Sequence, residues 1–244
     1  QKTAYEIVSR DWSSDVCSSD LNTLSSINMS YGSTNSNYLG TYIGGSRLLN
    51  GAIGNAQIYN RALSASEIQN LYNTGVPTYL PTSSIVNQGL SVYYDFSNPN
   101  SYPGSGTTVY DLSGYGNNGT LTNGPTFSAT NLGNIVFDGT DDNIQLGNAS
   151  TFLPTSAITL SCWAKTNTTT SYKKLFVTIN SGNGPAGLRG LYWSLGSDGS
   201  YYFGVITNIG TVDVNQILSL STTRYYNFAA TYDGSTIKIY LDGV

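Results

Sequence analysis

The sequence contains no histidine, and glutamate occurs only at Glu6 and Glu67. Without histidine, neither a Ser-His-Asp triad nor a Cys-His pair can form, which excludes the common nucleophilic hydrolases. Basic residues are few and form no cluster, so we expect no nucleic-acid partner. No apolar run approaches roughly 18 residues, so we also expect no insertion into a membrane.

Charge is scarce as well, since charged residues make up 10% of the chain, against roughly 25% in ordinary globular proteins. Serine, threonine, asparagine, glycine and tyrosine take their place, and the net charge is −4. Disordered chains have few aromatic residues and high net charge, whereas this chain has 20 tyrosines. The composition therefore indicates a folded protein whose surface is rich in hydroxyl and amide groups.

Residues 1–21, QKTAYEIVSRDWSSDVCSSDL, have no hydrophobic periodicity and differ in character from the rest of the chain. They resemble the translation of a short-read sequencing adapter. We treat them as an artefact, exclude them from the fold, and expect a disordered, exposed tail that packs against nothing. Cys162 is then the one remaining cysteine, and its place in a strand pattern predicts a small buried side chain and no disulfide.

Most of the remaining sequence is typical of short β-strands separated by turns. The dipeptides typical of tight turns are Asn50-Gly51, Asn118-Gly119, Asn123-Gly124, Asp138-Gly139, Asp198-Gly199, Asp233-Gly234 and Asp242-Gly243. Alternating apolar residues at 226–232 and 237–241 predict a hairpin with one buried face. The same alternation at 160–164, with Trp163 on the opposite side, and at 135–146 predicts further core strands.

One helix is expected. Ser64 and Glu67 have the spacing of a capping box, in which the hydroxyl and the carboxylate each bind a backbone amide at the start of a helix. The apolar residues at 68–72 then share one helical face. Pro77 marks the end of the helix, and residues 76–88 are interpreted as a linker.

Two stretches resemble the laminin-G-like, concanavalin-type jelly-roll family. Residues 50–73, NGAIGNAQIYNRALSASEIQNLYN, resemble the closing strand and terminal helix of that family. Residues 89–147, which include YDLSGYGNNGTL and FDGTDDNIQL, resemble its opening, and ITLSCWAK and YDGSTIKIYLDG resemble its middle strands. The resemblance implies an all-β fold: a concanavalin-type antiparallel β-sandwich (a jelly roll) with one short helix.

In this chain the ending of the family pattern comes before its beginning. We interpret residues 22–75 as the C-terminal portion of one laminin-G-like module and residues 89–244 as the N-terminal portion of another, clipped from a tandem array. Half a jelly roll would expose sheet edges and one face of the core. We therefore expect the two portions to form one circularly permuted sandwich.

That arrangement makes three specific predictions. Residues 52–59 should pair with residues 90–96, Asn22 should lie near Val244, and the helix at 64–73 should cover one end of the sandwich. Residues 89–147 also resemble modules in virion proteins of tailed bacteriophages, which implies an extracellular or virion-surface location.

The family that the sequence resembles also includes glucanases, which use two glutamates on one strand. Outside residues 1–21 the single glutamate is Glu67, which we assign to the helix cap. Asp141 and Asp142 are adjacent, and neighbouring strand residues point to opposite faces, so they cannot flank one sugar bond unless the turn bends them. We therefore expect no catalytic residues and a protein that is not an enzyme.

Calcium is the one cofactor that the resemblance implies, bound at a rim by oxygen ligands. The candidate ligands form two groups, Asp111 with Asn117 and Asn118, and Asp138 with Asp141 and Asp142. The alternative is that these side chains cap turns through nearby backbone amides, and the sequence alone favours it.

Aromatic side chains are candidates for stacking on sugar rings. The candidates are Tyr115, Tyr172, Trp193, Tyr201, Tyr202 and Tyr232. For any one of them, packing within a strand is the simpler interpretation.

Three functions remain open. The leading one is a non-catalytic module of a larger extracellular or virion protein that binds a glycan or cell-surface polysaccharide, next to other modules of the same array. The alternatives are a purely structural spacer and, least favoured, a glycoside hydrolase.

Overall fold

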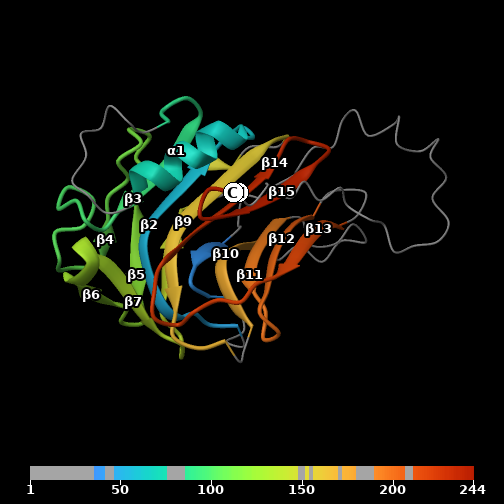
Figure 1. The fold of residues 1–244 in the computed structure, drawn as a ribbon. Helices are drawn as coiled ribbons and strands as arrows, with labels where there is room; N and C mark the ends of the chain where they lie inside the picture. The colour runs from blue at the N-terminus through green and yellow to red at the C-terminus, as the bar shows by residue number, and fades with distance from the viewer. Residues whose placement is uncertain are drawn as a thin grey trace, which may run out of the picture.

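The computed structural model describes residues 36–41, 47–75, 86–147, 152–153, 156–169, 172–179, 190–206 and 211–244. In this part of the chain, two antiparallel sheets face each other across one hydrophobic core, and one α-helix lies on the outside (Figure 1). The expected all-β sandwich with one short helix is confirmed. Residues 1–21, expected as a disordered tail, and Asn22, expected near Val244, lie outside the described residues.

The eight-stranded sheet has the order β13-β12-β11-β10-β1-β8-β5-β4. Its strands are β1 (Ser36–Leu39), β4 (Thr108–Val109), β5 (Gly119–Thr122), β8 (Asn143–Leu146), β10 (Lys173–Ile179), β11 (Gly190–Leu195), β12 (Ser200–Ile206) and β13 (Thr211–Ile217).

The seven-stranded sheet has the order β15-β14-β9-β2-β7-β6, and β3 pairs with β2. Its strands are β2 (Asn50–Tyr59), β3 (Leu90–Asp95), β6 (Thr126–Ser128), β7 (Asn134–Asp138), β9 (Ile158–Thr166), β14 (Tyr226–Tyr232) and β15 (Ile237–Leu241). Helix α1 (Ala65–Gly75) follows β2, and a 3-10 turn (Thr130–Leu132) precedes β7.

Strand β2 lies inside the seven-stranded sheet and pairs along both of its edges. One edge pairs with β9 over eight residue pairs. The other edge pairs first with β7 and then, beyond an irregularity at Gly54, with β3 over five residue pairs. The expected pairing of residues 52–59 with 90–96 is present, so segments from before and after the 76–88 linker share one sheet.

The period-two patterns place their apolar residues in the core, as expected. Leu160, Cys162 and Ala164 of β9 belong to the main cluster, whereas Trp163 faces outward and stacks on Tyr72 of α1 at a centroid distance of 5.5 Å. Burial raises the pKa of the Cys162 thiol, which has no disulfide partner among the described residues. The hairpin of β14 and β15 around Asp233 is also confirmed.

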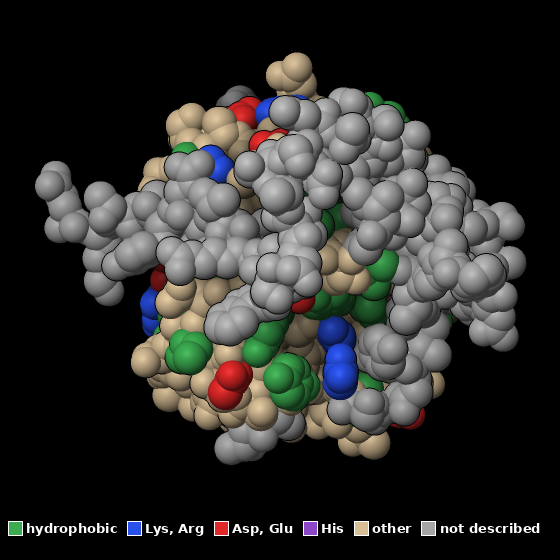
Figure 2. Space-filling model, turned by 90° about the vertical axis from the view of Figure 1, so that its right-hand side faces the viewer, with side chains coloured by type: hydrophobic (Ala, Val, Ile, Leu, Met, Phe, Trp, Pro, Cys, Tyr) green, Lys and Arg blue, Asp and Glu red, His purple; other side chains and the backbone are tan. Residues whose placement is uncertain are grey.

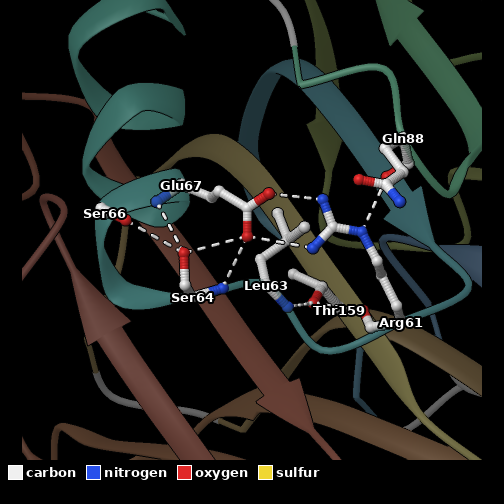
Figure 3. Close-up of polar contacts among 7 residues, drawn as sticks. All are labelled: Arg61, Leu63, Ser64, Ser66, Glu67, Gln88 and Thr159. Carbon is white, nitrogen blue, oxygen red and sulfur yellow. Dashed lines mark hydrogen bonds and ion pairs between the residues drawn. The ribbon is translucent and has the colours of Figure 1, made fainter.

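Helix α1 begins with the expected capping box (Figure 3). The Ser64 backbone N–H donates to Glu67 Oε2 at 2.9 Å, and the Glu67 N–H donates to Ser64 Oγ at 3.3 Å. The Arg61 guanidinium adds two hydrogen bonds to the same carboxylate. This pairing lowers the pKa of Glu67 to about 2, so the carboxylate stays ionised and serves as part of the helix cap.

The helix covers the outer face of the seven-stranded sheet, and the prediction that it covers one end of the sandwich is wrong. Ile68 and Leu71 pack in a second apolar cluster with Tyr59, Ala229 and Tyr240, which point away from the main core. This outward face is apolar and needs a covering layer, which the helix supplies (Figure 1). No helix in the described ranges is long and apolar enough to cross a membrane.

Five of the seven predicted turn dipeptides contain a glycine with positive φ, as tight turns require. The predictions at Asn50-Gly51 and Asn118-Gly119 are wrong, because these glycines belong to β2 and β5. A Cβ at Gly51 would lie 2.0 Å from the Lys165 carbonyl oxygen. Glycine at this position therefore permits the close approach of β2 and β9.

A buried hydrogen-bond chain connects the two sheets. Trp193 Nε1 on β11 donates to the hydroxyl of Tyr201 on β12 at 2.8 Å. That hydroxyl donates in turn to the Ala229 carbonyl of β14 in the opposite sheet, also at 2.8 Å. Because all three residues are buried, the chain fixes the sheets relative to each other at this level of the core.

We expect Tyr201→Phe to lower the free energy of unfolding by about 1–3 kcal/mol, because the Trp193 N–H would lose its acceptor in the core. Urea unfolding monitored by tryptophan fluorescence measures this change. Tyr202→Phe is the matched control, since that neighbouring side chain is only half-buried. Equal stability of the two variants would contradict a structural role for the Tyr201 hydroxyl.

Candidate functional site

An open groove with a volume of about 400 Å³ lies on the outer face of the eight-stranded sheet. Strands β10 to β13 form most of its floor, and Arg47, which precedes β2, contributes to its rim. The side chains that give it chemical character are Arg47, Tyr172, Lys174, Tyr192, Tyr202 and Asp213. Figure 2 shows hydrophobic and basic side chains next to one another on the side of the molecule that carries β12 and β13.

The ring of Tyr192 forms part of the groove floor because the residue opposite it is a glycine. Tyr192 pairs with Gly204 on β12, where an added Cβ would come within 2.1 Å of the ring. The ring therefore extends across β12, and its hydroxyl donates a hydrogen bond to Asp213 on β13. Burial and the Asp213 carboxylate raise the pKa of Tyr192, so the phenol stays protonated.

Two cations contact aromatic rings in the groove. The Lys174 ammonium lies 4.8 Å from the Tyr192 ring centroid and donates to Ser194 Oγ at 2.8 Å. Burial, with a further contribution from nearby Arg47, lowers the pKa of Lys174 to about 8. The Arg47 guanidinium lies 5.6 Å from the centroid of the Tyr172 ring. Both distances fall in the range of cation–π contacts.

The rim of the groove carries a second pair of rings. Tyr172 and Tyr202 have ring centroids 6.1 Å apart and planes inclined by 36°. Tyr172 is 42% exposed, so one side of its ring is accessible to a ligand. A hydrogen bond with Tyr202 raises the pKa of Tyr172. The groove therefore offers neutral aromatic rings, hydroxyl groups and charges within one surface.

A separate group of carboxylates lies in the turn between β7 and β8. The carboxylate oxygens of Asp138, Asp141 and Asp142 lie within 4.8 Å of one another. Asp142 Oδ2 accepts a hydrogen bond from the Asp138 N–H at 2.9 Å, but its buried Oδ1 has no partner among the described residues. Burial, reinforced by the two neighbouring aspartates, raises the pKa of Asp142. This oxygen-rich turn fits a hard cation.

The other group of candidate calcium ligands is used inside the protein. Asp111 Oδ1 accepts hydrogen bonds from the N–H groups of Tyr93 and Ser113, and Oδ2 accepts from the Ser113 hydroxyl and the Asn117 N–H. Asn118 Oδ1 accepts from the Asp111 N–H. Four donors occupy the lone pairs of the Asp111 carboxylate, so the turn-capping alternative accounts for this group.

Residues 138–244 match the family model of the concanavalin A-like lectin/glucanases superfamily. This part of the chain is therefore similar to that superfamily, and the two-sheet fold agrees with the match. The matched range includes β8 to β15, and so it includes the strands that form the floor of the groove and the Asp138–Asp142 turn. No curated protein and no solved structure matches the chain.

Within the lectin/glucanase-type sandwich, three of the six aromatic candidates lie in the wrong place for ligand binding. Trp193, Tyr201 and Tyr232 are at most 1% exposed and belong to the main core, so they cannot stack on a ligand. Tyr115 is 74% exposed but is not among the groove residues. Tyr172 and Tyr202 are the two candidates that the structure brings together.

Sequence reasoning missed Arg47, Lys174, Tyr192 and Asp213. For Tyr192 a signal was present, because Leu191, Trp193 and Leu195 alternate and belong on the buried face, which turns Tyr192 outward. No local signal marks Arg47, which joins the groove of the lectin/glucanase-type sandwich from the opposite end of the chain.

We expect Gly204→Ala to displace the Tyr192 ring and break its hydrogen bond to Asp213, because the new methyl group would overlap the ring. NMR of ring-labelled tyrosine, with Tyr192 assigned through Tyr192→Phe, measures the displacement. Gly147→Ala is the matched control, since a Cβ there meets nothing within 4 Å. An unchanged Tyr192 resonance in Gly204→Ala would show that the ring does not depend on this glycine.

Proposed function

We propose that this protein is a non-catalytic carbohydrate-binding module and that the groove on the eight-stranded sheet holds a segment of a polysaccharide. The observation that carries the proposal is the set of three tyrosine rings, Tyr172, Tyr192 and Tyr202, that line one open groove together with charged and hydroxyl side chains. Ligand sites combine aromatic surface with a few polar groups that fix orientation. Sugar rings, with apolar C–H faces and hydroxyl edges, suit such a surface.

The small number of carboxylates in the groove supports a role in binding without catalysis. Glycosidases place two carboxylates across the scissile bond, roughly 5–10 Å apart. Among the described residues that line the groove, Asp213 is the single carboxylate, and it already accepts the Tyr192 hydroxyl. The clustered aspartates at 138–142 belong to a different element, the turn between β7 and β8.

We further propose that the module belongs to a larger extracellular or virion-surface protein. The support is the resemblance of residues 89–147 to modules of phage virion proteins and the composition, which is poor in charge and rich in hydroxyl groups. In such a protein the module would attach its neighbours in the array to a glycan or cell-surface polysaccharide.

On a glycan array, we expect the protein to bind at least one polysaccharide, and Tyr202→Ala and Tyr172→Ala each to weaken that binding roughly tenfold, because each removes aromatic contact area. Tyr115→Ala is the matched control: the same residue type, more exposed, and outside the groove. Equal losses of affinity in all three variants would argue against the groove as the binding site.

Two other results would overturn the proposal. Absence of binding to every glycan, in a protein shown to be folded, would favour the structural spacer. Release of reducing sugar from a β-glucan panel, abolished by Asp141→Asn, would establish a glycoside hydrolase.

We also propose that Asp138, Asp141 and Asp142 hold a calcium ion. The support is the buried Asp142 Oδ1, which has no donor among the described residues although burying an unsatisfied charged oxygen is costly. A divalent cation with oxygen ligands would compensate that oxygen and the neighbouring carboxylates. It would stabilise the turn between β7 and β8.

We expect calcium to raise the melting temperature of the wild-type protein and to leave that of Asp142→Asn nearly unchanged. At about 100 times the dissociation constant, the ion would add ~2.7 kcal/mol of stability. The effect should fade as the pH falls through the raised pKa of Asp142, because the protonated carboxyl no longer binds the ion. Differential scanning calorimetry with calcium or a chelator measures both effects.

Without calcium, the stability of the protein changes with pH in the opposite direction. A raised folded-state pKa means that the charge of Asp142 destabilises the calcium-free protein as the pH rises through that pKa. Asp233→Asn, in the β14–β15 turn, is the control and should keep the response to calcium. Calorimetric titration that detects no binding down to millimolar affinity would rule out calcium at this turn.

A further inference from the structure

The groove differs in charge from the chain as a whole. The chain has a net charge of −4, yet among the described residues that line the groove Arg47 and Lys174 are positive and Asp213 is the single carboxylate. A cationic groove on an acidic protein concentrates anionic ligands at that surface.

The charges are also separated along the groove. Lys174 lies on β10, Tyr192 on β11, and Asp213 on β13, with the Tyr192 ring between the ammonium and the carboxylate. Arg47 lies on the same side as Lys174, since the Lys174 N–H donates to the Arg47 carbonyl at 3.3 Å. The groove therefore has a cationic half next to β10 and an anionic edge at β13.

We propose that the polysaccharide held in this groove is acidic and that its carboxylate or sulfate groups lie at the cationic half, beside Arg47 and Lys174. This inference rests on the proposed carbohydrate-binding function and specifies its ligand class. Tyr172 and Tyr202 contact the sugar rings, the Arg47 guanidinium donates to the acid group at the exposed rim, and Lys174 supplies a second charge from the floor.

The surroundings of Lys174 suit this role. Lys174 is only 3% exposed, so its ammonium is poorly hydrated and acts on an acid group in the groove through its electrostatic field rather than by direct contact. The cation–π contact with Tyr192 and the hydrogen bond to Ser194 hold the amine in one position. A fixed, poorly hydrated charge attracts an anion more strongly than a surface lysine does.

The test compares three soluble polysaccharides by isothermal titration calorimetry: polygalacturonate, which carries carboxylates, dextran sulfate, which carries sulfates, and neutral dextran. We expect wild-type protein to bind one of the acidic polymers at least about tenfold more tightly than dextran. Arg47→Gln and Lys174→Gln should each remove about a factor of ten. Because Arg47 is exposed, Arg47→Gln tests the role of positive charge in binding even if Lys174→Gln folds poorly.

Lys238→Gln is the matched control, because it removes the same charge from β15 in the other sheet. An equal loss in Lys238→Gln would show general attraction between the polymer and any basic residue, which would overturn the proposal. Preference for polygalacturonate over dextran sulfate, or the reverse, identifies the acid group.

A pH series gives an independent readout. Binding of the acidic polymer should weaken between pH 7 and 9, because the pKa of Lys174 is lowered to about 8 and the amine loses its charge in that range. Among the described residues, the other titratable groups that line the groove are Arg47, Asp213 and the three tyrosines, and Tyr172 and Tyr192 have raised pKa values. Lys174→Gln should abolish the pH dependence, and its persistence in that variant would contradict the assignment.

The outcomes separate this inference from the proposed function. Binding of neutral glycans that depends on Tyr202 but not on Arg47 or Lys174 would overturn the acidic ligand and leave the carbohydrate-binding module in place. Failure to bind any polysaccharide, neutral or acidic, would overturn both.

Discussion

The pairing of β2 along both of its edges is the constraint on which the rest of the structure depends. Eight residue pairs join it to β9, and its other edge holds β7 and β3. Without β2, these three strands would present open edges and the core would lose Ile53 and Ile58. The 50–59 segment therefore cannot form a separate unit, although residues 76–88 separate it in sequence from the strands it joins.

The groove depends on the same early segment. Strand β1 pairs with β10 and β8 in the eight-stranded sheet. Arg47, which precedes β2, lies next to Lys174, since its carbonyl accepts the Lys174 N–H. One half of the groove's positive charge thus comes from a region that the family match at 138–244 does not include. The early segment thus contributes both to the pairing of the sheets and to the lining of the groove.

Local patterns in the sequence predicted the features that neighbouring residues determine. The β14–β15 hairpin, the core positions of β9 and the Ser64–Glu67 cap all depend on spacing within a few residues. The outward face of a sheet is harder to predict, because an exposed tyrosine and a buried one satisfy the same β-propensity. Trp193 was one of the candidates for sugar stacking, whereas the alternation of its own strand assigns it to the core and Tyr192 to the groove.

Asp111 and Asp142 show why the candidate calcium ligands could not be told apart in sequence. Both follow a strand and stand near glycines, and both have carboxylates that can cap turns. Asp111 receives four hydrogen bonds, one of them from the Tyr93 N–H of β3, 18 residues away. Asp142 receives one, on Oδ2, and its other oxygen is buried with no donor among the described residues. The number of donors that distant strands deliver to an aspartate is set by tertiary packing, which a local sequence pattern does not contain.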